Sequence, residues 1–545
     1  MRTRRSETTQ GGPRRHRLGR AGRAVVVAAT LFPLLAPTAP AVAHDQPPTA
    51  RAMQPLGGDI HHHLHGAVNT NTIITWAIMD GLCLDEATWT ARNRVDDQCP
   101  GATRPITGQD RPNLLRQWSM RDFQFPPDGD PNPGHDHFFG TFGRYDAAIA
   151  GRDQDILAEV ARTAAIEHVS YIETLLGAQS SQLRRFVANT PLPDPNPDNL
   201  GEFYDQLTQA DGFTGIVDAA AAEYQSKYVG YRSPNHLNCN EANPTPACRV
   251  VIRFDFQARR TDTPKLVFAQ LILGVLLASD ASTKVVGVNL VQPEDDPTAL
   301  RDYRLHMAMV GFLTNKLLNA KFSLHAGELV YRLNQVQRYM RQDPPPEDPL
   351  SFHVRAAVEA GVKRIGHGVD FFSEADPEGL AATMRERHIL VEVPLSSNDG
   401  ILRVTGRDHP LQRWLNDMAD RVPVTLSSDD PGITNSTLAS EYQFAIATQS
   451  LTNEQLVTLS RASLDHAFVE GENLWIVPDN YQQNNVIDIC RAIPLGTTWD
   501  QLDPACRDRL HASTKATLQW QYEIDRKAAP HATLSHDDRT LAPAR

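Results

Sequence analysis

The chain has 545 residues, a formal net charge of −12 and 41% hydrophobic residues. This length allows one large domain or a few smaller ones, and the apolar content is sufficient for a sizeable core. The acidic balance argues against a nucleic-acid partner and against an anionic membrane surface, because both favour basic proteins.

The first 43 residues differ in composition from the rest of the chain. A basic stretch, residues 1–23, precedes an apolar run that ends in the small-x-small pattern Ala-Val-Ala at residues 41–43. This order is typical of an export signal that is cleaved near Ala43. The alternative is a membrane anchor, but three prolines interrupt the apolar run and disfavour a spanning helix. We therefore expect a secreted or periplasmic protein with no membrane partner after cleavage.

All six cysteines follow this signal. Each has a near neighbour in the sequence, so the simplest pairing is Cys83 with Cys99, Cys239 with Cys248, and Cys490 with Cys506. Disulfides are expected in an oxidising compartment. Zinc ligation is the alternative, and the lack of any C-x-x-C pair disfavours it.

Eight apolar, β-branched runs recur along the chain, and segments with helical spacing lie between them. Strands that alternate with helices predict an α/β fold, a parallel (β/α)₈ (TIM) barrel. We expect it to occupy residues 44–525 as one domain. The runs are residues 57–66, 168–177, 249–257, 284–291, 321–328, 364–370, 389–397 and 422–430.

Three segments stand outside this alternation. Residues 83–140 are rich in Arg, Asp and Pro and follow the first strand, so we expect an inserted lid or side wall held by Cys83–Cys99. Residues 438–470 predict two extra helices after the eighth strand. Residues 526–545 are polar, and a disordered tail is expected there.

The stretch GGDIHHHLHGA, residues 57–67, carries four histidines in five residues. Successive strand residues point to opposite faces, so His61 and His63 share a face and His62 points away. His65 lies just past the strand. Similar polar residues end later strands: His325 and Glu328, His367, and Asp429 with Asp430.

In a barrel these residues would meet at the carboxyl ends of the strands, where active sites lie. Three imidazoles and one carboxylate suit a catalytic zinc ion. The alternative is a set of unrelated surface residues, which their order on an eight-strand pattern disfavours. A binuclear site is a second alternative, but the fourth strand ends in GVNLVQPED without the lysine that often bridges two ions. We expect one metal ion per chain.

The motifs HHHLHGA, HAGE, RIGHG and SSDDP resemble those of adenosine deaminases, including the secreted, growth-factor-like branch. The resemblance runs from about Gly57 to Glu470. It implies that water attacks C6 of a purine, that a protonated carboxyl group donates to N1, and that ammonia leaves. The implied roles are zinc ligands for His61, His63, His325 and Asp429, N1 contact for Glu328, activation of the attacking water for His367, and N7 contact for Asp430.

Two positions depart from the family pattern, in which the first motif usually reads H-x-H-L-D-G. Here His65 replaces the Asp that helps to hold the ribose 5′-hydroxyl, although a solvated loop residue is the alternative reading. Gln292, followed by Pro293, stands where the family often has a glycine whose backbone N–H meets purine N3. That N–H is still present in Gln292. Both changes affect the expected substrate range and leave the deamination chemistry in place.

Five weaker candidate residues remain, in three segments of the chain. Ser396, Ser397 and Asn398 end the seventh strand and are either orienting donors or ordinary turn residues. His306 lies within a helical segment and is expected to be packed, and Glu173 is not assigned a role.

The leading hypothesis is an exported, zinc-dependent deaminase of adenosine and 2′-deoxyadenosine. One alternative keeps the reaction and changes the substrate to adenine, a 5′-modified nucleoside or an N6-substituted purine. Another is a secreted signalling or nucleoside-binding protein. The sequence leaves the oligomeric state open.

Overall fold

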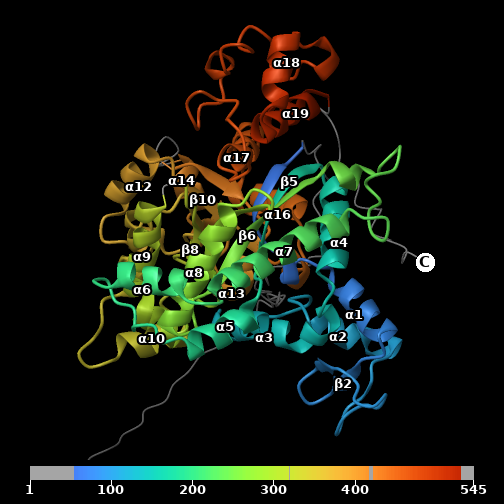
Figure 1. The fold of residues 1–545 in the computed structure, drawn as a ribbon, viewed down its shortest axis with the longest axis vertical. Helices are drawn as coiled ribbons and strands as arrows, with labels where there is room; N and C mark the ends of the chain where they lie inside the picture. Colours follow the sequence, from blue (N-terminus) through green and yellow to red (C-terminus); the bar gives the residue numbers. More distant parts are fainter. Residues whose placement is uncertain (1–54, 318, 417–421, 529–545) are drawn as a thin grey trace, which may run out of the picture. The chain divides into compact units, whose positions relative to one another are not determined.

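The computed structural model describes residues 55–317, 319–416 and 422–528. The expected export signal and all but the first three residues of the expected tail lie outside these ranges. Within them, the eight predicted runs form eight strands in the predicted order (Figure 1). These are β1 (Gly57–His63), β5 (Val169–Leu176), β6 (Val251–Arg259), β7 (Val285–Val291), β8 (Ser323–Ala326), β9 (Arg364–His367), β10 (Leu390–Val393) and β11 (Val424–Leu426).

These strands form two four-stranded parallel sheets, ordered β1-β5-β6-β7 and β11-β10-β9-β8. Backbone contacts join the sheets at both edges. At one edge Val288 N donates to Lys321 O at 3.0 Å. At the other, His63 N donates to Asp429 O at 2.7 Å and Asp429 N donates to His61 O at 2.9 Å. The parallel sheet therefore curls until its first strand meets its last, as a (β/α)₈ barrel requires.

Helices follow the strands and cover the sheet. Several begin where the sequence supplies a cap: the Asp296 side chain accepts from Thr298 N at 2.8 Å to start α9, and the Asp376 side chain accepts from Gly379 N to start α12. Helix α8 is apolar around its whole circumference, because it is buried between the sheet and α9. The helices are α5 (Ser180–Asn189), α6 (Leu200–Gln209), α7 (Phe213–Tyr231), α8 (Pro264–Ala278), α9 (Pro297–Lys316), α10 (Asn334–Met340), α11 (His353–Glu359), α12 (Pro377–Glu386), α13 (Leu395–Leu402), α14 (Leu411–Asn416), α15 (Pro431–Thr434), α16 (Leu438–Gln449) and α17 (Asn453–Asp465).

A long excursion separates β1 from β5. After α1 (Thr70–Met79) comes a small antiparallel sheet of β2 (Cys83–Asp85), β3 (Thr90–Arg92) and β4 (Arg104–Pro105). Helices α2 (Arg111–Gln117), α3 (Asn132–Ile149) and α4 (Asp153–Ile166) follow. The Cys83–Cys99 disulfide closes the small sheet, as expected.

The excursion reaches the loops at the carboxyl ends of several strands. Met120 N donates to Ile433 O after β11 at 2.7 Å. His135 Nε2 lies 3.0 Å from Asp295 Oδ1 after β7, and Asn132 Oδ1 accepts from Asn334 N after β8 at 2.8 Å. Helix α3 also packs against α13, which follows β10. The excursion therefore forms a wall at the carboxyl-end mouth of the barrel.

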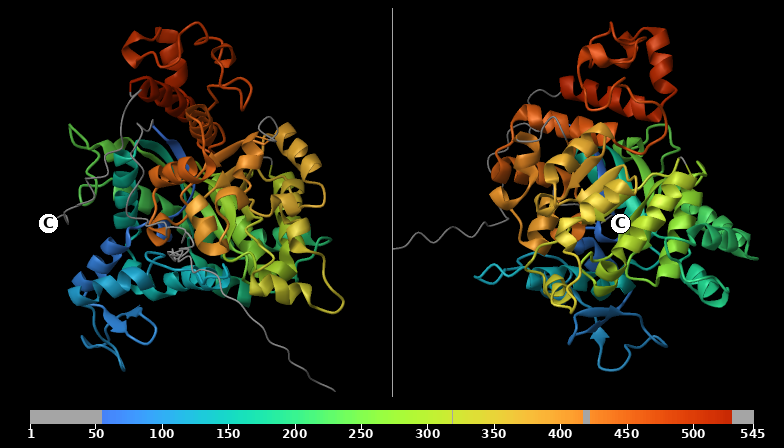
Figure 2. Two further views of the ribbon diagram at one scale, coloured as in Figure 1. Left: turned by 180° about the vertical axis from the view of Figure 1, so that it is seen from behind. Right: turned by 90° about the vertical axis from the view of Figure 1, so that its left-hand side faces the viewer.

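The C-terminal part was only partly predicted. After α17, residues 474–528 form a module with its own small apolar core around Leu474, Leu510, Trp520 and the Cys490–Cys506 disulfide. It carries α18 (Pro504–His511) and α19 (Thr514–Ala528). The sequence predicted a tail from Arg526, whereas α19 continues through Ala528, because Trp520, Tyr522 and Glu523 are buried and anchor the helix. Figure 2 shows this module on the side of the barrel away from the β2 sheet.

The third neighbour pair, Cys239–Cys248, is also bonded. No helix in the described ranges is long and apolar enough to cross a membrane.

Candidate active site

Four donor atoms converge at the carboxyl ends of β1, β8 and β11. His61 Nε2 and His63 Nε2 each lie 3.2 Å from His325 Nε2. Oδ1 of Asp429 lies 3.4 Å from His61 Nε2 and 3.2 Å from His63 Nε2. Ligand atoms about 2 Å from a tetrahedral zinc ion lie roughly 3.3 Å apart, so these spacings fit one shared cation.

The far nitrogens of two of these rings are already occupied. His61 Nδ1 lies 2.7 Å from Glu392 Oε2, and His325 Nδ1 lies 2.8 Å from Asn289 Oδ1. Because these oxygens accept hydrogen bonds, each Nδ1 carries the proton and each Nε2 presents its lone pair to the shared point. Oδ1 of Asp429 is buried without a hydrogen-bond donor among the described residues. The donor set therefore suits a metal ion.

The carboxylates of the cluster also favour a bound positive charge. Burial lowers the pKa of His61, but the hydrogen bonds and charges of Asp429 and Glu392 outweigh burial and raise it to about 10. A bound cation would satisfy the same carboxylates and leave the imidazoles neutral.

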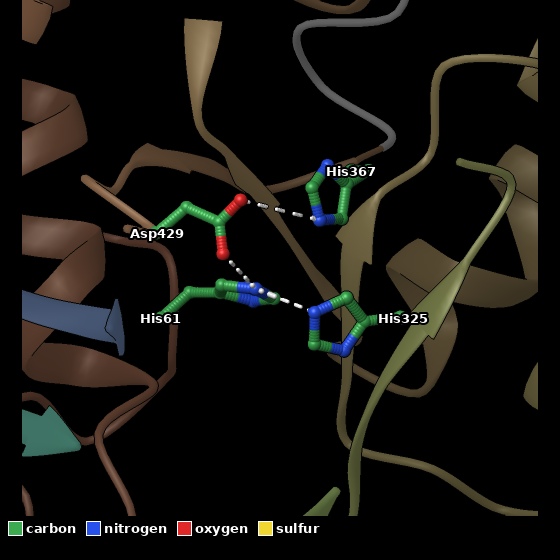
Figure 3. A group of neighbouring side chains, drawn as sticks. All are labelled: His61, His325, His367 and Asp429. Carbon is green, nitrogen blue, oxygen red and sulfur yellow. Dashed lines mark hydrogen bonds and ion pairs between the residues drawn. The ribbon is translucent and has the colours of Figure 1, made fainter. Parts of the chain in front are cut away.

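Figure 3 shows His367 grouped with His61, His325 and Asp429, whose candidate ligand atoms all lie within 4.8 Å of one another. His63 belongs to a second such group, with Asp429 and Asp430. His63 contacts the same Asp429 oxygen as His61, whereas His367 Nε2 faces the other oxygen, Oδ2, at 3.9 Å. Its Nδ1 lies 2.8 Å from Asn398 Oδ1, so the Nε2 lone pair is free. Burial lowers the pKa of His367 to about 4. The ring is therefore a neutral base next to the cluster.

Glu328 supplies the complementary acid. Oε1 of Glu328 lies 3.7 Å from His367 Nδ1. Burial raises the pKa of Glu328 well above its usual range, and the carboxylates of Asp429 and Glu294 add to the shift. Burial therefore favours the protonated carboxyl group, a state in which it donates a hydrogen bond or a proton.

The backbone at Glu328 is held by a residue that the sequence analysis missed. Oε2 of Glu294 accepts from Glu328 N at 2.8 Å, and Oε1 accepts from Gly327 N at 3.2 Å. His353 Nδ1 lies 2.6 Å from Oε1. In the sequence, the QPED segment, residues 292–295, stands out only because Gln292 replaces a glycine of the family pattern. Nothing in the segment indicates which backbone groups Glu294 contacts.

Asp430 is buried, and its Oδ1 has no hydrogen-bond partner among the described residues. Burial raises its pKa well above the usual range, and the charge of Asp429 raises it further. A β-carbon on Gly66 would collide with this carboxyl group. Gly366 has a related role, since a β-carbon there would lie 2.5 Å from His61 Cε1. Glycines in the first and third motifs thus leave room for site side chains.

Three strand ends carry positive φ angles on residues with side chains. These are Gln292 at +85°, His367 at +67° and Asp429 at +61°. The left-handed region is unfavourable for such residues by about 1–3 kcal/mol, and strain of this kind clusters at functional sites. Gln292 thus adopts the conformation that a glycine takes most easily, which explains in physical terms why a glycine suits this position.

His62 and His65 do not join the cluster. His62 Nδ1 lies 2.8 Å from Thr174 Oγ1 on the other side of β1, as strand parity predicts. His65 lies in the 3-10 turn after β1, where its Nε2 is 2.8 Å from Asp153 Oδ1. Its side chain is 42% exposed.

The weaker candidates separate clearly. Asn398 contacts His367 as described, whereas Ser397 is buried without a hydrogen bond from its hydroxyl group to any described residue. Ser396 N donates to Glu441. His306 is packed within α9, and Glu173 lies in a buried charged group at the base of the barrel.

Part of the chain is similar in sequence to a known protein family. Residues 349–477 match the family model described as "Adenosine deaminase". The match covers less than half of the chain. It contains the elements from α11 to α17, and with them His367, Asp429 and Asp430. The other candidate site residues precede it in the chain: His61, His63, His65, Gln292, His325 and Glu328.

Curated relatives match over short segments. An adenosine deaminase of Clostridium kluyveri is 24% identical over 135 residues, 24% of this chain and 37% of the relative. An aminodeoxyfutalosine deaminase of Streptomyces coelicolor is 33% identical over 117 residues, 21% of this chain and 29% of the relative. The chain thus matches about a third of the length of these relatives. The solved N6-methyl-AMP deaminase of Arabidopsis thaliana is 18% identical, with a TM-score of 0.46, 76% of this chain and 93% of that chain covered.

Proposed function

We propose that this chain is an exported, zinc-dependent deaminase that converts adenosine and 2′-deoxyadenosine to the corresponding inosines and ammonia. One observation carries the proposal. Nε2 of three histidines, His61, His63 and His325, and a carboxylate oxygen of Asp429 lie close together. They lie beside His367, whose pKa burial lowers, and Glu328, whose pKa burial raises. Hydrolytic deamination of a purine needs these three functions together.

The residues that would hold the zinc ion are His61, His63, His325 and Asp429, with one ion per chain. Catalytic zinc sites usually have three protein ligands and one water molecule, so with four protein ligands the water would take a fifth position. The chemistry that bound zinc supplies is a water molecule whose pKa is lowered toward neutrality.

His367 takes the proton of the attacking water. Its Nδ1–H is held by Asn398 Oδ1, so Nε2 is the basic atom, and it faces Asp429 Oδ2. As this proton moves to Nε2, the water oxygen forms a bond to purine C6, and the C6–N1 double bond is reduced to a single bond. A base of low pKa is the weaker proton acceptor, so the lowered pKa of the water is essential to this step.

Glu328 completes the addition by donating its proton to N1, where the electron pair of the broken double bond collects. The C6–N6 bond then breaks, and the amino group leaves as ammonia with the proton that His367 took from the water. The remaining proton of the C6 hydroxyl group passes to Glu328, which restores the acid, and the oxygen stays on C6 as a carbonyl group. Adenosine and water thus give inosine and ammonia. A carboxyl group kept neutral by burial is suited to this donation.

Asp430 is proposed to donate a hydrogen bond to purine N7. Nitrogen N7 is an acceptor, so the carboxyl group must be protonated, which agrees with the direction of its pKa. The unpartnered Oδ1 is available for such a contact. Gln292 is proposed to meet N3 through its backbone N–H, and His65 to contact the ribose 5′ end.

Export is supported by the cysteines. All six are joined in neighbour pairs, and disulfides persist in oxidising compartments. With the signal pattern that precedes Ala43, we propose a secreted or periplasmic enzyme of the growth-factor-like branch.

A related candidate keeps the chemistry and changes the substrate to another amino-purine. The observation that favours it is the contact between His65 and Asp153. His65 stands where the family has an aspartate that helps to hold the ribose 5′-hydroxyl, and its Nε2 already contacts Asp153. Adenine, a 5′-modified nucleoside or an N6-substituted purine are the alternatives.

A substrate panel tests the proposal. The chain from His44, with disulfides intact, is assayed for ammonia release from adenosine, 2′-deoxyadenosine, adenine, AMP and N6-methyl-AMP. Highest kcat/KM on the two nucleosides is expected. Preference for another member of the panel would replace the substrate and keep the reaction. Nucleoside binding without ammonia release from any member would overturn the enzyme assignment.

A further inference from the structure

An arginine is buried at the base of the barrel, below the proposed metal centre. Arg364 is the first residue of β9, and its side chain is fully buried. Its Nη2 lies 2.5 Å from Glu173 Oε2 and 3.2 Å from Asp255 Oδ2, and its Nε lies 2.5 Å from Glu392 Oε1. One cation thus faces three carboxylate side chains from β5, β6 and β10.

Glu392 links this arginine to the cluster above. Its Oε2 lies 2.7 Å from Nδ1 of His61, and Ser323 Oγ contacts both of its oxygens at 2.8 and 3.0 Å. Glu392 is fully buried, so it has no water to replace a lost partner. Glu392 therefore lies between Arg364 and the His61 ring and contacts both.

The C-terminal segment 466–470 packs against Arg364 from below. The ring of Phe468 covers the guanidinium group, with Cζ 3.7 Å from the ring centroid. Phe468 N donates to Glu173 Oε1 at 2.5 Å, and Arg364 Nη1 donates to His466 O at 3.2 Å. Lys321 Nζ also donates to Phe468 O at 3.0 Å. This segment therefore contacts Arg364 directly and also holds two of its neighbours, Glu173 and Lys321.

We propose that Arg364 is a positioning residue for the metal centre: held by Phe468 and Glu173, it keeps Glu392 against Nδ1 of His61 and thereby sets the affinity for the metal ion. The proposal rests on the metal centre of the proposed function. It extends that function to a segment at the opposite end of the barrel from the substrate. It assigns to residues 466–470 a role in metal retention, in addition to covering the barrel.

Partners that orient metal-bound histidines typically change metal affinity 10- to 100-fold when removed. Arg364→Lys keeps a positive charge but lacks the planar fork that reaches Glu173 and Glu392 together. Phe468→Leu keeps an apolar side chain but removes the flat surface on the guanidinium group. Both variants are therefore expected to weaken zinc binding by roughly 10-fold or more.

The control is Arg253→Gln. Arg253 pairs with Glu470 of the same segment, with Nε 2.9 Å from Oε2, but it does not contact Glu392. Its loss disturbs the same end of the barrel without touching the path to His61. Zinc affinity should stay within about 2-fold of the parent protein.

Zinc Kd is measured by chelator competition on the full mature chain, together with the visible absorption spectrum of the cobalt-substituted protein. Arg364→Lys and Phe468→Leu should raise the zinc Kd and shift the cobalt absorption bands. The control, Arg253→Gln, should change neither. KM for adenosine should stay constant in all three variants. Unchanged Kd and bands in both variants would overturn the proposal. If Arg364→Lys does not fold, Phe468→Leu decides alone. Zinc binding that is insensitive to His61→Ala would instead contradict the metal centre of the proposed function.

Discussion

The carboxyl group of Asp430 lies where a β-carbon on Gly66 would be placed. Gly66 ends the 3-10 turn after β1, and Asp430 follows β11, so the close approach occurs at one of the edges where the curled sheet meets itself. Gly66 belongs to the first motif, HHHLHGA, and Asp430 to the last, SSDDP, where it is the proposed contact for purine N7.

Gly66→Ala should therefore displace Asp430 and lower kcat/KM, mainly through KM, because the proposed N7 contact is lost. We expect a loss of about 10- to 100-fold, from one charged or strong hydrogen bond of roughly 1.5–3 kcal/mol. Steady-state kinetics on adenosine provide the measurement. Gly143→Ala is the matched control, since a β-carbon there meets nothing within 4 Å. Equal effects of the two substitutions would exclude this role for Gly66.

Activity should depend on pH through two groups. The base His367 must be neutral, and its pKa is lowered to about 4 by burial, so kcat/KM should fall as the pH drops toward that value. The acid Glu328 must be protonated, and burial raises its pKa, so kcat/KM should fall again as the pH rises through that raised value. Bell-shaped profiles report such a pair.

Glu328→Gln should lower kcat by about 10²- to 10⁴-fold, the usual contribution of one general acid. It should also remove the alkaline limb of the profile, since the amide does not titrate. Zinc content serves as the control, because Glu328 is not a proposed ligand. An alkaline limb that persists in this variant would assign it to another group.

The wall over the barrel mouth carries a pH-sensitive contact, His135 with Asp295. Burial lowers the pKa of His135, but the hydrogen bond and charge of Asp295 outweigh it, so the pKa in the folded protein is raised. The stabilisation is therefore complete below the unfolded pKa of about 6.5 and disappears as the pH rises through the raised folded value.

His135→Ala should accordingly destabilise the protein on the order of 1.5 kcal/mol at pH 6 and less at pH 9. Denaturant unfolding of both proteins at these two pH values measures the difference. A difference that is the same at both pH values would mean that packing, and not the ion pair, is lost.

Gln292→Gly should not lower the free energy of unfolding, although Gln292 lies beside the candidate site. Gln292 has φ of +85°, which glycine adopts without strain. We expect a gain in the free energy of unfolding of up to about 1 kcal/mol. Because glycine keeps the backbone N–H, KM for adenosine should hardly change. A clear rise in KM would instead assign the substrate contact to the glutamine side chain.

The strands and the main site were predictable because both depend on local pattern. Eight β-branched runs gave eight strands, and strand parity separated His62 from its neighbours. Strand ends in a parallel barrel meet at one mouth, so His61, His325, His367 and Asp429 could be placed together from their positions alone.

The partners of these residues could not be predicted, because they come from distant segments. Glu392 lies in an apolar strand run, and nothing local indicates that it meets His61, 331 residues away. The contact of His65 with Asp153 depends on how the excursion after β1 folds back. The C-terminal module has a core of its own, whose separate residues show no simple periodicity in the sequence.

The role of the metal ion tests the proposed function most directly. Adenosine loss is followed by ultraviolet absorbance with the mature protein before metal removal, after removal, and after addition of one equivalent of zinc, with His325→Ala alongside. We predict rapid turnover that disappears with the metal and returns with zinc, and no return in His325→Ala. Turnover that is unchanged after complete metal removal would contradict a zinc-dependent deaminase.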